Sequence, residues 1–261
     1  MTISTNQHSE EVTSSQPKQT CCPIVELRQY TLHPGKRDIL IELFDREFIE
    51  SQEILGIYVI GQFRDLDDPN RFVWLRGFRN MSERTEGLKA FYGGAVWKTH
   101  REAANATMID SDNVLLLRPA CPGSGFLLEN SHRPPPDAKE IPKGLVVATI
   151  YYLDASAGDD FVDFFERTLK PALIDTGASI LAYFVSERSA NAFPALPVRE
   201  GENAFICFSC FRDKARYEDH LAALLNTTHW RTEVSHELAR WVKRSPEVLK
   251  LTPTARSQLR C

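Results

Sequence analysis

The fold is decided by one stretch near the start of the chain, Glu26-Leu27-Arg28-Gln29-Tyr30-Thr31-Leu32-His33-Pro34-Gly35. It predicts a short strand that runs into a tight turn, because proline fixes φ and glycine accepts the positive φ that follows. Residues 35–55 then repeat apolar side chains every three to four positions, which predicts an amphipathic helix. The same unit returns about 120 residues later, as an apolar strand over 146–153 and a second helix.

Both halves of the chain continue with the same order of elements. The first half adds predicted strands at 57–63, 71–78 and 114–118 and a helix at 82–108, which Gly93-Gly94 could interrupt. The second half has a helix at 159–176, strands at 179–185, 204–211 and 248–251, and a helix at 214–241. Each half therefore predicts β-α-β-β-α-β, the ferredoxin-like unit. Because such a sheet carries both helices on one face, we expect the bare faces of two sheets to pack together as one intramolecular α+β barrel.

Composition divides the chain into four parts. Residues 1–22 are rich in serine, threonine and glutamine and are expected to form a disordered tail. Residues 23–119 and 144–261 are the two expected domains. Between them, residues 120–143 form a predicted linker, since the segment from Pro119 to Lys143 holds six of the fifteen prolines and cannot hold a helix.

Charge and hydropathy exclude several classes of partner. The net charge is −4 and no run of lysine or arginine occurs, so no nucleic acid is expected. No apolar run approaches the roughly 20 residues that a membrane span needs. The N-terminal residues lack the basic start and apolar centre of a signal peptide. A reducing, cytoplasmic location is expected because the cysteines fit buried free thiols.

The segment Cys207-Phe208-Ser209-Cys210 has the CxxC spacing of a redox or metal-binding motif, but no other feature of one. It lies inside a predicted strand, where positions three apart point to opposite faces, so the two thiols cannot share a metal or easily bond to each other. We expect both to be buried free thiols, and we predict neither a metal site nor a bound cofactor.

The chain resembles the NIPSNAP family. The resemblance is carried in order and spacing by four blocks, Glu26–Leu32 with Pro34–Lys36, Gly56–Tyr58, Arg71–Arg76 and Val96–Lys98. It covers about 24–119 well and 144–253 as a more diverged copy. The resemblance implies the dimeric α+β barrel fold, which is shared with cofactor-free oxygenases, haem-degrading enzymes and polyketide cyclases. It implies no single reaction and no family-wide catalytic set.

Candidate binding residues come from two predicted strands of the first half. Glu26, Arg28 and Tyr30 share one strand face, and Arg76 shares a face with Trp74 and Phe78. If Val25 and Leu27 face the helices, the polar side chains point into the space between the two sheets. That arrangement predicts a pocket with Arg28 and Arg76 as anchors of an acidic or enolic molecule and Trp74 and Phe78 as its apolar wall.

The second half lacks these polar side chains, since Thr149 stands at the position of Arg28 and Ser209 at that of Arg76. The competing interpretation is a structural Arg–Glu bridge, because buried charges are more often paired than catalytic. Tyr30 is a candidate proton donor. His100, one helical turn after Trp97, is a candidate general base or haem ligand.

Three classes of function remain open from the sequence. The first is a protein that binds, and could transform without a bound cofactor, a hydrophobic acidic or enolic organic molecule by monooxygenase, cyclase or isomerase chemistry. The second is a non-catalytic protein-interaction module, and the third is haem binding or degradation. The asymmetry between the halves favours the first. Self-association into a homo-oligomer also stays open.

Overall fold

The computed structural model describes residues 21–128, 131–154 and 158–261. The predicted N-terminal tail therefore lies, up to residue 20, outside the described residues. Eight strands in this part of the chain form one closed barrel in the order β1-β3-β2-β8-β5-β7-β6-β4. Their bounds are β1 Ile24–Leu32, β2 Tyr58–Asp65, β3 Arg71–Phe78, β4 Met108–Pro119, β5 Leu145–Tyr152, β6 Ser179–Ser186, β7 Ala204–Phe211 and β8 Glu247–Pro253.

The two halves contribute four strands each and close the barrel through their edges. Within the first half the order is β4-β1-β3-β2, and the second half repeats it as β8-β5-β7-β6. Antiparallel pairing of β2 with β8 and of β4 with β6 joins the halves. No strand edge between them is left open, which removes the template for aggregation that a free edge presents.

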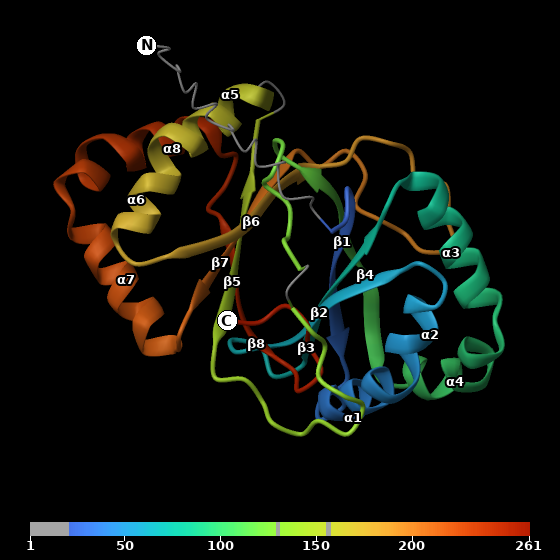
Figure 1. Cartoon of the computed structure of the whole chain (residues 1–261). Coiled ribbons are helices and arrows are strands. Elements are labelled where there is room, and N and C mark those ends of the chain that lie inside the picture. The colour runs from blue at the N-terminus through green and yellow to red at the C-terminus, as the bar shows by residue number, and fades with distance from the viewer. Residues whose placement is uncertain (1–20, 129–130, 155–157) are drawn as a thin grey trace, which may run out of the picture.

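Helices cover the outside of the barrel in two groups, α1 to α4 over the first half and α5 to α8 over the second (Figure 1). Their bounds are α1 Arg37–Leu43, η1 Phe44–Phe48, α2 Ile49–Glu53, α3 Met81–Gly93, α4 Ala95–Asn105, α5 Gly158–Phe164, η2 Phe165–Leu169, α6 Lys170–Asp175, α7 Lys214–Asn226, η3 Trp230–Val234 and α8 Ser235–Trp241. The η segments are single wide π-turns inside longer helices. In the described part of the chain, no helix combines the length and apolar character needed to cross a membrane.

The helix expected over 82–108 is interrupted at Gly94, within the Gly93-Gly94 pair where a break was expected; the extended backbone of Gly94 separates α3 from α4. One predicted boundary differs from the structure. The strand expected over 114–118 begins already at Met108, because β4 pairs with almost the whole of β1 through an irregular register between Gln29 and Leu32.

The faces of β1 and β3 are the reverse of our expectation. Val25 and Leu27 lie in the barrel interior, in an apolar cluster drawn from the strands of both halves. The opposite face of β1, with Tyr30, packs against the helices of the first half. Alternation shows which side chains share a face but not which face is inside. The interior holds aliphatic and aromatic side chains, among them Phe63 and Phe184, and the charged side chains of β1 and β3 lie in the layer under the helices.

The C-terminal segment closes the barrel and corrects one cysteine prediction. Leu259 packs into the barrel interior, and its N–H donates to the carbonyl of Ile60 at 2.8 Å. Cys261 forms a disulfide with Cys210, so Cys210 is not the free thiol we expected. Cys207 is free and 2% exposed, as predicted. The error arises because the partner of Cys210 lies 51 residues away in sequence, beyond the reach of a local pattern.

Candidate functional site

Four charged side chains lie buried together in the layer between the sheet and helices of the first half. Glu26 and Arg28 come from β1, Arg76 from β3, and Arg84 from the first turns of α3; each is at most 1% exposed. The register of the sheet places Glu26 directly opposite Arg76. The start of α3 is fixed by Asn80, whose side-chain oxygen accepts the N–H of Glu83 at 2.8 Å, as helix caps do.

One carboxylate serves all three guanidiniums. Oε2 of Glu26 accepts from Nη1 of Arg28 and from Nε of Arg76, each at 2.7 Å, while Oε1 accepts from Nε of Arg84 at 2.7 Å. Burial alone would raise the pKa of Glu26, but the three neighbouring cations outweigh it and hold that pKa far below its usual range. Glu26 is therefore ionised at neutral pH.

The cluster carries an excess of positive charge. Three guanidiniums against one carboxylate leave a net charge of +2. The other polar partners are neutral: Gln52 and Tyr92 accept from Arg76 Nη1 at 3.3 and 3.5 Å, and Asn191 accepts from Arg84 Nη1 at 3.0 Å. Within the described residues, Nη2 of Arg76 and Nη2 of Arg84 have no hydrogen-bond partner. Buried charge without a counter-ion is costly, so the site is suited to an anion.

Tyr30 is held beside the cluster as a neutral phenol. Its hydroxyl oxygen accepts from Nε of Arg28 at 3.0 Å. Burial raises the pKa of Tyr30, and the nearby Arg28 offsets this only in part. The hydroxyl is thus protonated at neutral pH. Because Arg28 donates to it and Tyr30 lines an adjoining cavity, its own hydrogen is available to a bound molecule.

An internal cavity of about 30 Å³ adjoins the cluster, with room for one or two water molecules. Its walls are mostly aromatic and come from β1, β3, the first residue of β4 and the helical segments of the first half, η1 included. The lining residues are Tyr30, Leu40, Phe44, Phe48, Gln52, Trp74, Phe91, Tyr92, Trp97, Ala104 and Met108. Gln52 and Tyr92 both line the cavity and both bond Arg76 Nη1, which places the guanidinium of Arg76 at its polar end. Gln52 is oriented by the wide turn η1, since its amide nitrogen donates to the carbonyl of Phe48 at 2.7 Å.

Comparison with known proteins gives the family of this half. Residues 25–122 match the family model NIPSNAP. The first half of the chain is a NIPSNAP domain. No curated protein matches the chain. That residues 144–253 are a diverged copy of the NIPSNAP domain stays a prediction.

Solved structures of similar fold cover both halves. A candidate monooxygenase from Fusobacterium nucleatum has a TM-score of 0.54 at 8% identity, covering 89% of this chain and 93% of its own. A candidate monooxygenase from Lactobacillus acidophilus has a TM-score of 0.52 at 14% identity, covering 93% and 100%. An anthrone oxidase-like protein has a TM-score of 0.52 at 15% identity, covering 91% and 95%. At these identities the likeness establishes a shared fold of the dimeric α+β barrel type.

The structure brings most of the predicted site residues of the NIPSNAP domain together, in a different place. Arg28 and Arg76 belong to the cluster, and Tyr30 and Trp74 lie beside it. All four face the helices rather than the barrel interior, which is mostly apolar and where the buried Gln29 shares the strand face of Val25 and Leu27. The indole of Trp74 lies under Arg76, with the guanidinium carbon 5.1 Å from the ring centre. Phe78 packs 5.6 Å from the same guanidinium but does not line the cavity.

His100 does not join the site. Its Nε2 lies 3.4 Å from Glu47 on the outer side of η1, the side chain is 28% exposed, and it does not line the cavity. The His100 ring packs behind the lining residue Phe48, with ring centres 6.4 Å apart, and the enclosed volume is far smaller than a haem, so this arrangement gives no support to the haem interpretation. Its role as a general base stays an untested prediction without structural support.

Sequence reasoning missed Arg84, Gln52, Tyr92 and Asn191. The internal repeat contains a signal for Arg84. At a separation of 133 residues it aligns Arg84 with Tyr217, so a charge present in the first half is absent from the second, as it is for Arg76 and Ser209. Asn191 had none, since it belongs to the loop between β6 and β7 of the other half. That loop also covers the NIPSNAP domain through Phe193, whose ring stacks on Tyr92 at 6.0 Å.

The equivalent positions of the second half carry no charged side chain. Val147, Thr149, Ser209 and Tyr217 stand where the NIPSNAP domain has Glu26, Arg28, Arg76 and Arg84. The register confirms the match, because Val147 lies opposite Ser209 as Glu26 lies opposite Arg76. The second half reaches the same packing without a charge cluster, so the fold itself does not require one.

Proposed function

We propose that the NIPSNAP domain binds a hydrophobic organic molecule through an acidic or enolic oxygen. The observation that carries this proposal is the buried cluster in which three guanidiniums share the single carboxylate of Glu26. A purely structural bridge would balance its charges, whereas this one retains an excess of two positive charges. A bound anion supplies the missing counter-charge.

The donors and the walls are suited to different parts of such a molecule. The anionic oxygen would accept from Arg76, whose Nη2 is free, with Arg84 Nη2 and the Tyr30 hydroxyl as further donors. The aromatic walls, among them Phe44, Phe48 and Trp74, would hold the hydrophobic part. Charge-assisted hydrogen bonds of this kind are about twice as strong as neutral ones, so the oxygen fixes the orientation.

Entry of such a molecule requires the cavity to widen, and α4 is the element suited to move. Ala104 is the buried residue of α4, and Trp97 is its half-buried cavity contact. Elements with few buried contacts open at low cost in free energy. We propose that α4 swings outward at Gly94, carrying Trp97 away from Phe48, to which its ring lies at 5.6 Å.

The site is also suited to chemistry on an enol. Cations next to an enol favour its ionised form and lower its pKa, which is the electrostatic stabilisation that enolate reactions need. Tyr30 can return a proton to the carbon of the enolate; the tyrosinate left behind is stabilised by Arg28 and regains its proton from water. The proton that the enol loses on ionising goes to water, so an isomerisation needs no further reactant. Oxidation of the enolate by molecular oxygen, which would be the oxidant, is the second option, in keeping with the candidate monooxygenases that share the fold.

Isothermal titration with aromatic probes tests the binding. We expect 2-naphthoate or 2-naphthol to bind the full chain and methyl 2-naphthoate not to bind. Arg76→Met and Arg84→Met should each weaken binding at least about tenfold, the value of one lost hydrogen bond to a charged group. Arg46→Met is the matched control, because Arg46 lies on η1 with its side chain 64% exposed and does not line the cavity. Equal binding of acid and ester, or binding that survives both variants, would refute the proposal.

A further inference from the structure

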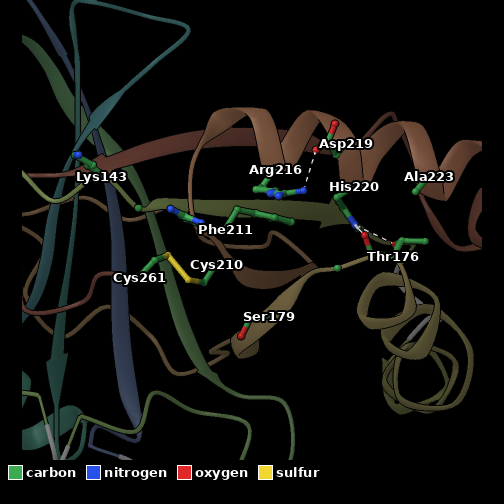
Figure 2. A pocket seen from close by; sticks show the side chains of 13 residues that line it. Lys143, Thr176, Ser179, Cys210, Phe211, Arg216, Asp219, His220, Ala223 and Cys261 are labelled. Atoms are coloured by element: carbon green, nitrogen blue, oxygen red, sulfur yellow. Dashed lines mark hydrogen bonds and ion pairs between the residues drawn. A yellow bond between two sulfur atoms is a disulfide. The ribbon is translucent and has the colours of Figure 1, made fainter.

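A second, larger cavity lies in the second half of the chain and holds the disulfide. It measures about 800 Å³ and opens to solvent. Its walls come from the α6–β6 turn, the end of β7, one face of α7 and the segment before β5. Figure 2 shows Cys210 and Cys261 joined near the middle of these walls, with Arg216 and His220 on the helix above them.

Both cysteines of the disulfide are accessible from this cavity. Cys261 is exposed and Cys210 is half-buried, and both line the walls. Their Cα atoms are 5.7 Å apart, an ordinary separation for a disulfide. The other described cysteines, Cys21, Cys22, Cys121 and Cys207, are free thiols. A single accessible disulfide in a chain of otherwise reduced cysteines fits an exchangeable bond better than a structural one.

The fold does not need this bond to hold its C-terminal segment. Arg256 is 2% exposed and forms an ion pair with Glu50 of the first half. Ser257 and Leu259 are buried, and the Ser257 hydroxyl bonds the Gln62 N–H and the Leu259 carbonyl. These contacts fix the segment up to two residues before Cys261. Opening the disulfide therefore frees a sulfur without releasing the segment from the barrel.

The cavity attracts an anion. Lys143 and Arg212 line it, are exposed, and form no ion pair within the described part of the chain. Arg216 is offset by Asp219, with Nη1 at 3.4 Å from the carboxylate. The side chains of the walls thus carry two unbalanced positive charges, which raise the local concentration of small anions.

A neutral imidazole completes the polar lining. His220 is 4% exposed, and its Nδ1 lies 3.2 Å from the Thr176 carbonyl, which can only accept. The Thr176 hydroxyl oxygen lies 3.0 Å from the same nitrogen, and its own hydrogen is directed to the carbonyls of Ala172 and Leu173. Both Thr176 oxygens can therefore accept from a hydrogen on Nδ1, which leaves Nε2 with a lone pair and no partner among the described residues. Burial lowers the pKa of His220, which keeps it neutral. The ring lies 5.1 Å from Phe211, another wall of the cavity.

We propose that this cavity is a thiol-exchange site for a small anionic thiol, a cysteine-containing peptide with more than one carboxylate. Lys143 and Arg212 bind its carboxylates. Its thiolate attacks Sγ of Cys261, the more exposed of the two sulfurs. A new sulfur–sulfur bond forms to Cys261, the bond between Cys261 and Cys210 breaks, and Cys210 leaves as a thiolate that takes up a proton. The proton lost by the incoming thiol goes to His220 Nε2 or to water, so electrons and protons balance without a further reactant.

The test compares three thiols on the full chain, with intact-mass and peptide mass spectrometry as the measurement. At equal thiolate concentration, reduced glutathione, which is anionic, should modify Cys261 at least about tenfold faster than the cationic thiol cysteamine, with neutral 2-mercaptoethanol between them. Lys143→Gln with Arg212→Gln should abolish this preference. Lys214→Gln is the matched control, because Lys214 is exposed on α7 but does not line the cavity.

Three results would overturn the proposal. One is an equal rate for the anionic and cationic thiols. Another is modification at Cys121 or another free thiol in place of Cys261. The third is rapid alkylation of both Cys210 and Cys261 in the protein purified without reductant, which would show that they are not joined. The Cys210→Ser variant provides a second test, because it leaves the thiol of Cys261 free. This thiol should form the same mixed disulfide with oxidised glutathione, and the rate should depend on Lys143 and Arg212 in the same way.

Discussion

Glu26→Gln and Arg76→Met remove opposite charges from the same buried cluster, and we expect them to change stability in different directions. Glu26 is the single carboxylate bonded by Arg28, Arg76 and Arg84. Its loss leaves three buried cations with no counter-ion. Loss of Arg76 leaves Glu26 still paired with two guanidiniums and lowers the excess charge from two to one.

The magnitudes follow from the distances. Because Arg28 and Arg76 both donate to Oε2 of Glu26 at 2.7 Å, the two cations lie within about 5 Å and repel by about 3 kcal/mol at an effective dielectric constant of about 20. Arg84 repels Arg76 by a similar amount, while Glu26 attracts it by about 6 kcal/mol at 2.7 Å and that dielectric constant. The repulsions and the attraction therefore nearly cancel. Because Arg76→Met also removes the desolvation cost of a buried cation, it should leave stability unchanged or raise it. Glu26→Gln should cost at least about 3–5 kcal/mol.

Urea unfolding and thermal melting of the apo protein measure both effects. Glu26→Gln should lower the melting temperature by roughly 10 °C, and Arg76→Met should leave it the same or higher. Arg46→Met, on the exposed side of η1, is the control for loss of a positive charge. If Arg76→Met instead destabilises the protein by several kcal/mol, the cluster is a structural bridge and the reasoning from excess charge is wrong.

Three further predictions concern other parts of the molecule. Burial raises the pKa of Asp45 to about 6. Between about pH 4 and 6 the folded state therefore keeps a proton that the unfolded chain has lost, so the free energy of unfolding should fall as pH rises through that range. Asp45→Asn should make this pH dependence flatter in urea unfolding measured at several pH values. A fragment of residues 21–119 exposes the edges of β2 and β4 and the apolar face with Val25 and Leu27, so it should dimerise or aggregate; a stable monomer in analytical ultracentrifugation would contradict this. Cys207→Ser should cost about 1–3 kcal/mol more than Cys207→Ala by the same unfolding assay, because a hydroxyl would be buried without a partner, and metal content should not change in either.

The order of elements was predictable because it depends on local patterns that repeat. The Pro34-Gly35 turn, the helical spacing after it and the recurrence of the same unit near residue 146 indicate the strand order that the barrel shows. The choice of face was not predictable in this way. Val25 and Glu26 alternate identically whichever side is the interior, and the decision depends on how much volume the barrel and the helix layer each leave.

The composition of the site was partly predictable for the same reason. Arg28 and Arg76 stand out because the second half has Thr149 and Ser209 in their places. Their partner Arg84 lies on a helix, and the alternation of side chains along a strand carries no information about helical residues. Asn191 and the bond between Cys210 and Cys261 depend on contacts between segments far apart in sequence, which no local pattern encodes.

Native mass spectrometry of the purified full chain tests the central claim most directly. We predict that the wild-type protein, released from cells under gentle conditions, carries one small organic molecule that ionises as an acid. We predict that Arg76→Met and Arg84→Met lose this molecule, while Arg46→Met and Thr149→Ala, the latter at the second-half position that corresponds to Arg28, retain it. A bound molecule that is retained in both cluster variants, or a wild-type protein that neither carries a ligand nor takes up 2-naphthoate or 2-naphthol, would contradict the account.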